Sequence, residues 1–233
     1  MSDLLNLELL DADGAIRGSA ENAGLDRGDF LKKGALAGGG LIAGGAFFTQ
    51  YLGTAEARIS SVRRSKKNDV AILNFALTLE FLEAEFYEQA LDNKAFGTNP
   101  ALKRFTEVVA KHEAAHVTFL RNALGGSAIK KPKFDFGNTV KDPAMFADTS
   151  QLLEDTGVTA YLGQVANVLQ ATVLKAAGTI VTVEARHAAW IRFIINPPVE
   201  GTATKDLPAP RVFDQRKSEK AILKAVKGTG FIQ

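Results

Sequence analysis

The chain has 233 residues, of which 46% are hydrophobic and 23% charged, and its formal net charge is +2. This balance is ordinary for a globular protein and argues against a nucleic-acid-binding surface. No cysteine is present, which excludes disulfides, cysteine-ligated iron–sulfur clusters and thiol catalysis. The length suits a domain of about 150 residues with an extension at each end.

Residues 1–57 form the first extension. Residues 1–25 are polar and rich in Gly and Ala, which predicts a flexible lead. A basic run, Arg27-Gly-Asp-Phe-Leu-Lys-Lys33, then precedes an uncharged stretch from Gly34 to Tyr51 and a small-residue pattern, Thr54-Ala-Glu-Ala57. Basic, apolar, then cleavable is the order of an export signal, so we expect the protein in the periplasm or cell envelope.

In detail this segment resembles a twin-arginine export signal in which Gly28 stands where the second arginine would be. The alternative is a Gly-rich helix from Gly34 to Tyr51 that is retained in a cytoplasmic protein, where it packs in an assembly or associates with a membrane. A native N-terminus near Arg58 would indicate cleavage, and one at Met1 or Ser2 would indicate retention.

Two helices are predicted in the first half of the next region, residues 58–196. Apolar residues recur at steps of three or four from Asn68 to Leu91, the spacing of one helix face. Asn99 is a suitable N-cap, with Pro100 at the first helical position, for a second helix that ends near Leu124.

A long loop, KKPKFDFGNTVKDPAMF, follows and suits a crossover from one end of a helix bundle to the other. A third helix is predicted to begin at Thr149 or Ser150 as N-cap and to continue past Val165. A short link at 167–170 leads to a fourth helix, 171–195, which Pro197 and Pro198 end. The sequence therefore predicts an all-α protein, a four-helix bundle with one long crossover. Residues 197–233 then form a C-terminal arm with a short amphipathic helix from Ser218 to Val226.

Two Glu-x-x-His motifs mark the second and fourth helices. The first is Glu113 with His116, and the second is Glu184 with His187. A spacing of three puts both side chains on one helix face. With 13 glutamates and three histidines in the chain, two such pairs arise by chance in only about 1% of cases.

The first and third helices carry a matching pattern. Glu80 is followed seven residues later by Tyr87, and Glu154 is followed seven residues later by Tyr161. Each is then followed by Glu-x-x-His on the next helix, so the bundle consists of two copies of one helix pair.

A bundle core that joins these motifs would contain four carboxylates and two imidazoles, which suit two divalent metal ions. The metal ions would neutralise carboxylates whose burial as uncompensated charges costs several kcal/mol each. Protonation of the carboxylates together with internal water is the other means of compensation. The predicted ligands are Glu80, Glu113, His116, Glu154, Glu184 and His187.

These motifs resemble those of the ferritin-like di-iron carboxylate proteins. More narrowly, LNFALTLEFLEAEFYEQAL, HEAAHVTFLRNALGG, LLEDTGVTAYLGQV and IVTVEARHAAWIR, with the tail Ala209-Pro-Arg-Val-Phe-Asp214, resemble the desiccation-related ferritin-like family. The resemblance implies a ferritin-like bundle that holds two iron ions, or alternatively manganese or mixed metals.

The resemblance also implies roles for individual residues. Glu113 and Glu154, or their equivalents, would span or flank both metals, and Glu80 with His116 would complete one site. The sequence does not specify which carboxylate bridges the metals. The other site would take Glu184 and His187. Tyr87 and Tyr161 would hydrogen-bond to carboxylates across the bundle, although packing with any polar neighbour is an equally ordinary role for a buried tyrosine.

Several nearby residues have ordinary structural interpretations. Glu83 lies on a neighbouring face and could substitute for Glu80. His112 is expected to be partly exposed or to act as a cap, with contact to a ligand as its alternative role. Trp190 and the loop phenylalanines are expected to pack.

The leading functional hypothesis is a di-metal oxidoreductase or metal-handling protein in oxidative or desiccation stress, with dioxygen or peroxide as substrate. No catalytic residue is assigned apart from the metal ligands. The alternative is a structural or stress-protective envelope protein whose metal site only stabilises the bundle or is vacant. A homo-oligomer formed through the terminal segments is also expected.

Overall fold

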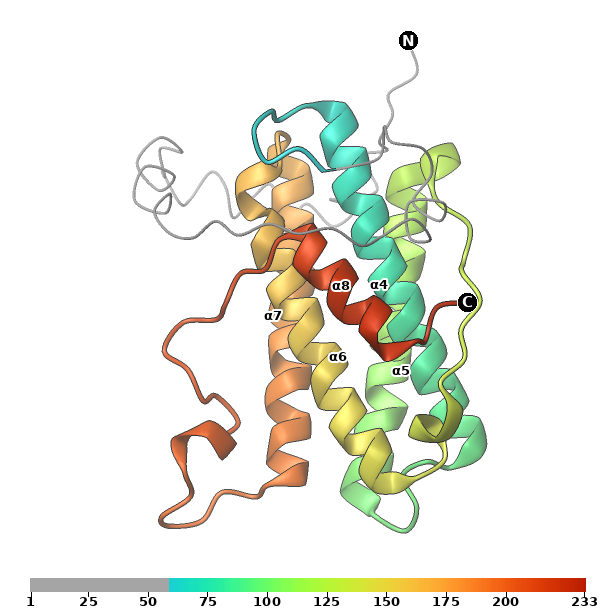
Figure 1. The fold of residues 1–233 in the computed structure, drawn as a ribbon, viewed down its shortest axis with the longest axis vertical. Coiled ribbons are helices and arrows are strands. Elements are labelled where there is room, and N and C mark those ends of the chain that lie inside the picture. The colour runs from blue at the N-terminus through green and yellow to red at the C-terminus, as the bar shows by residue number, and fades with distance from the viewer. Residues whose placement is uncertain (1–58) are drawn as a thin grey trace.

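The computed structural model describes residues 59–233, and the predicted segment boundaries and export signal within residues 1–57 lie outside that range. Four long helices lie side by side and form the body of the molecule (Figure 1). They are α4 (Lys66–Asn93), α5 (Pro100–Leu124), α6 (Pro143–Gln164) and α7 (Ala171–Ile195). The prediction of an all-α four-helix bundle is therefore confirmed. None of the described helices is both long and apolar enough to cross a membrane.

Side-chain caps fix the starts of α4 and α5. Ser65 accepts a hydrogen bond from the backbone N–H of Asn68 at the start of α4. Asn99 accepts from the backbone N–H groups of Ala101 and Leu102 at the start of α5, so the predicted cap is confirmed. These bonds satisfy amide groups that have no partner within the helix.

The start of α6 differs from the prediction. The N-cap is Asp142, which accepts from the backbone N–H groups of Ala144 and Met145, and Pro143 takes the first helical position. Thr149 and Ser150 lie inside the helix, and the Ser150 hydroxyl donates to the Phe146 carbonyl at 2.8 Å. A serine can bond in this way to the preceding turn, so it need not mark a helix start.

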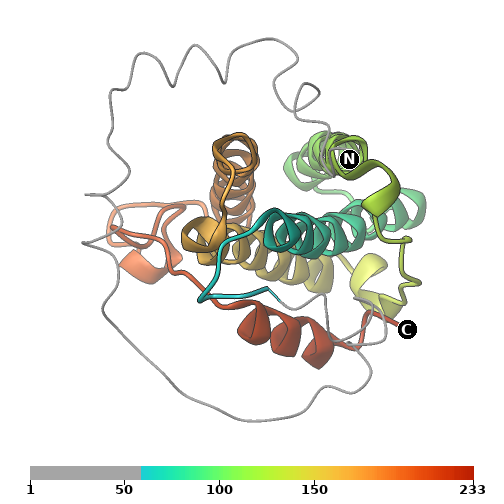
Figure 2. The same cartoon turned by 90° about the horizontal axis from the view of Figure 1, so that it is seen from above.

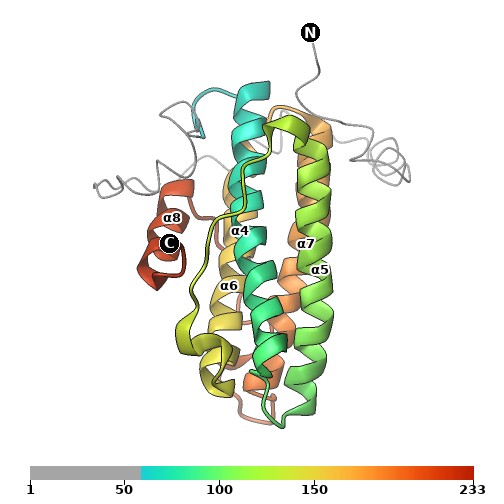
Figure 3. The same cartoon turned by 90° about the vertical axis from the view of Figure 1, so that its right-hand side faces the viewer.

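The crossover between α5 and α6 runs along the length of the bundle, as predicted (Figure 3). It contains two short 3₁₀ turns, η3 (Gly125–Ser127) and η4 (Gly137–Val140). Phe136 from this segment is buried against Phe86 of α4, with ring centroids 5.3 Å apart. The crossover thus contributes to the core as well as connecting the helix pairs.

A buried carboxylate organises the short link between α6 and α7. The link contains η5 (Val165–Asn167). Asp69 of α4 is fully buried and accepts from the backbone N–H groups of Leu169 and Gln170 at 2.8 and 2.9 Å. It thereby fixes the first helix to the start of the fourth.

The C-terminal arm returns across the bundle. It includes the turn η6 (Thr204–Asp206) and ends in α8 (Glu219–Thr229), which lies beside α4 and α6 (Figure 2). Ser218 caps α8, and Ile222 and Val226 are buried. Beyond α8, the N–H of Gln233 donates to the Lys133 carbonyl at 3.0 Å. The predicted amphipathic helix therefore exists and covers one face of the bundle.

The core has two apolar clusters that occupy different parts of α5 and α7. One is rich in aromatic rings, including Phe86, Phe105 and Phe146. The other is largely aliphatic, including Leu77 and Val173. On α5 and α7 the Glu-x-x-His motifs fall between residues of the two clusters. The polar side chains therefore form a layer across the middle of the bundle.

Gly163 of α6 permits the close approach of the arm. A Cβ atom at this position would lie 1.8 Å from the Lys217 carbonyl oxygen, and Lys217 N–H donates to the Thr159 carbonyl at 3.0 Å.

We expect Gly163→Ala to displace the arm and to increase protease cleavage within residues 198–217, measured by limited proteolysis and mass spectrometry. Gly178→Ala in α7 is the control, because no atom lies within 4 Å of its added Cβ. Equal cleavage rates in wild type and Gly163→Ala would contradict the packing described.

Candidate metal centre

Each of the four long helices directs at least one carboxylate into the polar layer. Glu80 lies on α4 and Glu154 on α6, and both side chains are fully buried. The α5 and α7 helices each supply a Glu-x-x-His pair, in which Glu113 and Glu184 are also fully buried. The structure therefore brings the six predicted ligands together from segments more than 100 residues apart.

The six residues form two overlapping groups. Within each group, the ligand atoms all lie within 4.8 Å of one another. One group contains Glu80 and His116, and the other contains Glu154 and His187. Glu113 and Glu184 belong to both groups. The sequence left open which carboxylates are central, and the geometry places Glu113 and Glu184, one from each Glu-x-x-His helix, in both groups, with Glu154 flanking one of them.

Single ring nitrogens face several carboxylates. His116 Nδ1 lies 3.1 Å from oxygens of Glu80, Glu113 and Glu184. His187 Nδ1 lies 3.1 Å from Glu113 and 3.2 Å from Glu154. One ring N–H can point at only one oxygen. An ion whose bonds to nitrogen and oxygen measure about 2.0 to 2.2 Å separates its ligand atoms by about 3.0 to 3.4 Å, which is the spacing seen here.

The shared glutamates also contain oxygens that protein groups leave without a hydrogen bond. In the described part of the chain, these buried atoms include Glu113 Oε1 and both carboxylate oxygens of Glu184. Histidine nitrogens lie 3.1 Å from two of them, but not in a hydrogen-bonding direction. Buried polar atoms normally have a partner, so the donor set fits two bound divalent cations.

The crowding of carboxylates in this layer also raises the pKa values of several of its side chains. Burial raises the pKa of Glu154 to about 7 and, together with repulsion from Glu184, raises the pKa of Glu113 well above its usual range. Burial alone would lower the pKa of His187, but its close approach to the carboxylates of Glu113 and Glu154 outweighs this and raises that pKa to about 12. Without cations, the site therefore retains protons to reduce its negative charge.

Two tyrosines hold the outer glutamates in a reciprocal arrangement. The Tyr87 hydroxyl of α4 donates to Glu154 of α6. The Tyr161 hydroxyl of α6 donates to Glu80 of α4 at 2.5 Å. Both rings are buried, so each bond fixes the orientation of a carboxylate that faces the centre. These two reciprocal hydrogen bonds between α4 and α6 follow from the internal repeat, since each helix carries a Glu and a Tyr seven residues apart.

Glu83 is a fifth carboxylate beside this layer and is only 3% exposed. The equivalent position in the second half of the repeat is Gly157, where an added Cβ would lie 3.4 Å from Glu83 Oε1 and 3.5 Å from Glu184 Oε2. Burial, followed by repulsion from Glu184, raises the pKa of Glu83 well above its usual range. Glu83 thus lies in the layer in addition to Glu80 and does not replace it. The absence of a side chain at Gly157 leaves room for the Glu83 carboxylate, and this glycine is the feature of the sequence that could have indicated it.

His112 contacts a predicted ligand. Its Nδ1 lies 2.8 Å from Nε2 of His187, and the two rings stack with centroids 5.1 Å apart. His187 Nδ1 faces the carboxylates, so His112 is the partner of the nitrogen on the opposite side of the ring. A hydrogen bond at that position orients a histidine and selects its tautomer. Trp190 instead packs edge-on against Phe105, as expected for a core residue.

Comparison with known families agrees with this geometry. Residues 68–197, more than half of the chain, match the family model described as a ferritin-like domain. No curated protein matches the chain.

The raised pKa of Glu154 predicts how pH affects the metal-free protein. Its contribution to stability is complete below pH 4.5, the usual pKa, and is lost as the pH rises through about 7, which corresponds to about 3 kcal/mol. The contribution of His187 is lost only above its usual pKa of 6.5. Between pH 4.5 and 6.5 we therefore expect the free energy of unfolding of chelator-treated protein to fall.

Urea unfolding at several pH values, followed by circular dichroism, would measure this slope. Glu154→Gln should make the slope shallower because one titrating carboxylate is lost, whereas the exposed Glu88→Gln should leave it unchanged. A wild-type stability that rises over this interval, or identical slopes for wild type and Glu154→Gln, would contradict the proposed protonation.

Proposed function

This chain belongs to the ferritin-like family, and from that premise we propose that it is a di-metal carboxylate oxidoreductase of iron or manganese. The observation that carries the proposal is the pair of ligand groups that share Glu113 and Glu184. Two sites joined by common ligands hold their ions close enough to act on one small molecule. The resemblance to desiccation-related proteins supports a role in oxidative or desiccation stress.

The chemistry supplied by a bound pair of divalent ions is two one-electron oxidations, which together with two protons reduce dioxygen to hydrogen peroxide or hydrogen peroxide to two waters. The protein residues contribute binding and orientation. Glu80 and Glu154 face the centre from opposite helix pairs, each held by a tyrosine hydroxyl. The apolar clusters on either side of the polar layer restrict water, which strengthens electrostatic interactions within it.

The buried carboxylates also give the chain a capacity to hold protons at the site. Glu83 lies beside Glu184 but outside both ligand groups. Its raised pKa keeps a proton on the carboxyl group in the metal-free protein. His112 connects the outer nitrogen of His187 to the exposed surface of α5. His112 is therefore suitably placed to exchange protons with solvent while the metal-facing atoms remain buried.

Metal content and oxidant consumption together test this function. Protein purified without chelators and loaded with ferrous iron under anaerobic conditions should contain about two metals per chain. On addition of dioxygen or peroxide, it should consume the oxidant faster than ferrous iron alone. Glu113→Ala and His187→Ala should lose both the metal and the consumption, because each removes a predicted ligand. Elemental analysis and an oxygen or peroxide electrode measure the two quantities.

The control is Glu88→Ala, which removes an exposed glutamate from α4 and should leave metal content and consumption unchanged. Folding of every variant is checked by circular dichroism. If all the proteins are metal-free and equally stable, the di-metal site is wrong. If metal is bound without any oxidant consumption, the structural alternative, in which the ions only stabilise the bundle, replaces the oxidoreductase.

A further inference from the structure

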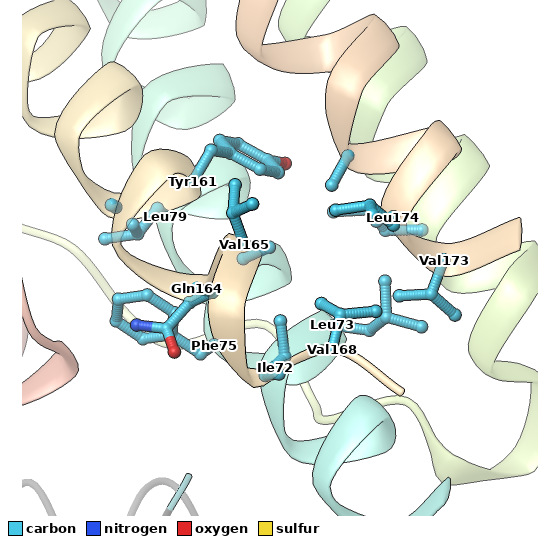
Figure 4. Close-up of a pocket in the computed structure, with 14 residues that line it drawn as sticks. Ile72, Leu73, Phe75, Leu79, Tyr161, Gln164, Val165, Val168, Val173 and Leu174 are labelled. Atoms are coloured by element: carbon cyan, nitrogen blue, oxygen red, sulfur yellow. The ribbon is translucent and has the colours of Figure 1, made fainter. Parts of the chain in front are cut away.

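An apolar cavity lies between α4, α6 and α7, next to the polar layer (Figure 4). Its volume is about 20 Å³. A cavity of about 10 to 15 Å³ already admits one water molecule, so this cavity has room for one small molecule. The side chains around it include Ile72, Leu73, Leu79, Val168, Val173 and Leu174.

The lining offers little to a polar occupant. Its polar side chains are Tyr161 and Gln164. The Tyr161 hydroxyl donates to Glu80, and the Gln164 side-chain oxygen accepts from Asn167 at 2.8 Å. A polar molecule that enters an apolar space without enough partners loses hydrogen bonds to water, whereas apolar cavities can bind gases such as xenon.

Tyr161 connects the cavity to the metal centre. Its ring forms part of the cavity wall (Figure 4), and its hydroxyl lies 2.5 Å from Glu80 Oε1. Ala76, another lining residue, precedes Glu80 by one helical turn on α4. A molecule in the cavity would therefore lie against the side chain that holds a predicted metal ligand.

The cavity also has a side that reaches toward the surface. Among the residues that line it, Val165, Leu174 and Ala177 are partly exposed. They come from the end of α6 and the start of α7, where the short link joins the two helices. A small apolar molecule can thus approach from solvent without crossing the buried carboxylates.

We propose that this cavity takes up dioxygen and holds it beside the metal centre. Dioxygen is a small apolar molecule that suits this lining, whereas hydrogen peroxide needs more hydrogen bonds than the Tyr161 and Gln164 side chains can supply. The inference rests on the proposed function and selects dioxygen as the oxidant that uses this route. The two electrons that convert dioxygen to hydrogen peroxide would come from the metal pair when it is bound, and the two protons would come from solvent.

Xenon binding tests the cavity without any metal. Metal-free protein under xenon pressure should show one xenon atom among Ile72, Leu79 and Val173, by X-ray diffraction or xenon NMR. Ala177→Leu adds bulk to the lining away from the predicted ligands and should abolish this site. Ala114→Leu, on an exposed position of α5, is the matched control and should retain it. Absence of xenon from the wild-type cavity, or equal binding in Ala177→Leu, would overturn the proposal.

Kinetics of iron-loaded protein test the use of the cavity. Ala177→Leu should raise the KM for dioxygen about tenfold, the scale of a small steric change in an apolar pocket, while metal content and the rate with hydrogen peroxide stay at the wild-type values. An unchanged KM for dioxygen would overturn the proposed route. If wild type binds xenon but never consumes dioxygen, the oxidoreductase function fails while the cavity itself stands, so the two failures are distinguishable.

Discussion

The structure depends on the presence of five glutamate side chains in one buried layer: Glu80, Glu83, Glu113, Glu154 and Glu184. Together they would carry five negative charges in a region where burial disfavours charge. Two divalent ions would neutralise four of these charges. In the metal-free protein, burial and repulsion from Glu184 raise the pKa of Glu83 well above its usual range. The flanking apolar clusters make this compensation necessary, because they keep the carboxylates away from water.

The internal repeat explains how a single chain builds such a layer. Each half supplies a Glu on one helix and Glu-x-x-His on the next, and the tyrosines Tyr87 and Tyr161 then bond to the outer glutamate of the other half. The symmetry is broken at Glu83 and Gly157, since two glutamates would compete for one space. The crossover and the C-terminal arm lie outside this repeat and cover the α4 and α6 faces. The candidate metal ligands thus lie in the repeated part of the chain. The segments outside the repeat cover the surface of the bundle.

Much of this arrangement could be predicted from sequence because it depends on local rules. The Asn99-Pro100 start of α5 follows from cap chemistry, and the end of α7 ahead of Pro197 follows from the inability of proline to continue a helix. The start of α6 was mispredicted because Ser150 has the chemistry of a cap but bonds within the helix. The sharing of Glu184 and the contact of His112 with His187 depend on how helices are rotated against each other. That rotation is set by packing between distant segments, which helical spacing alone does not specify.

We infer that two metal ions bind between the four helices, with Glu113 and Glu184 common to both sites. Anomalous X-ray diffraction from crystals of iron-loaded protein, collected above and below the iron absorption edge, tests it most directly. The account predicts two iron peaks per chain, one among Glu80, Glu113, His116 and Glu184 and the other among Glu113, Glu154, Glu184 and His187. A single peak, or peaks that avoid the shared glutamates, would contradict it.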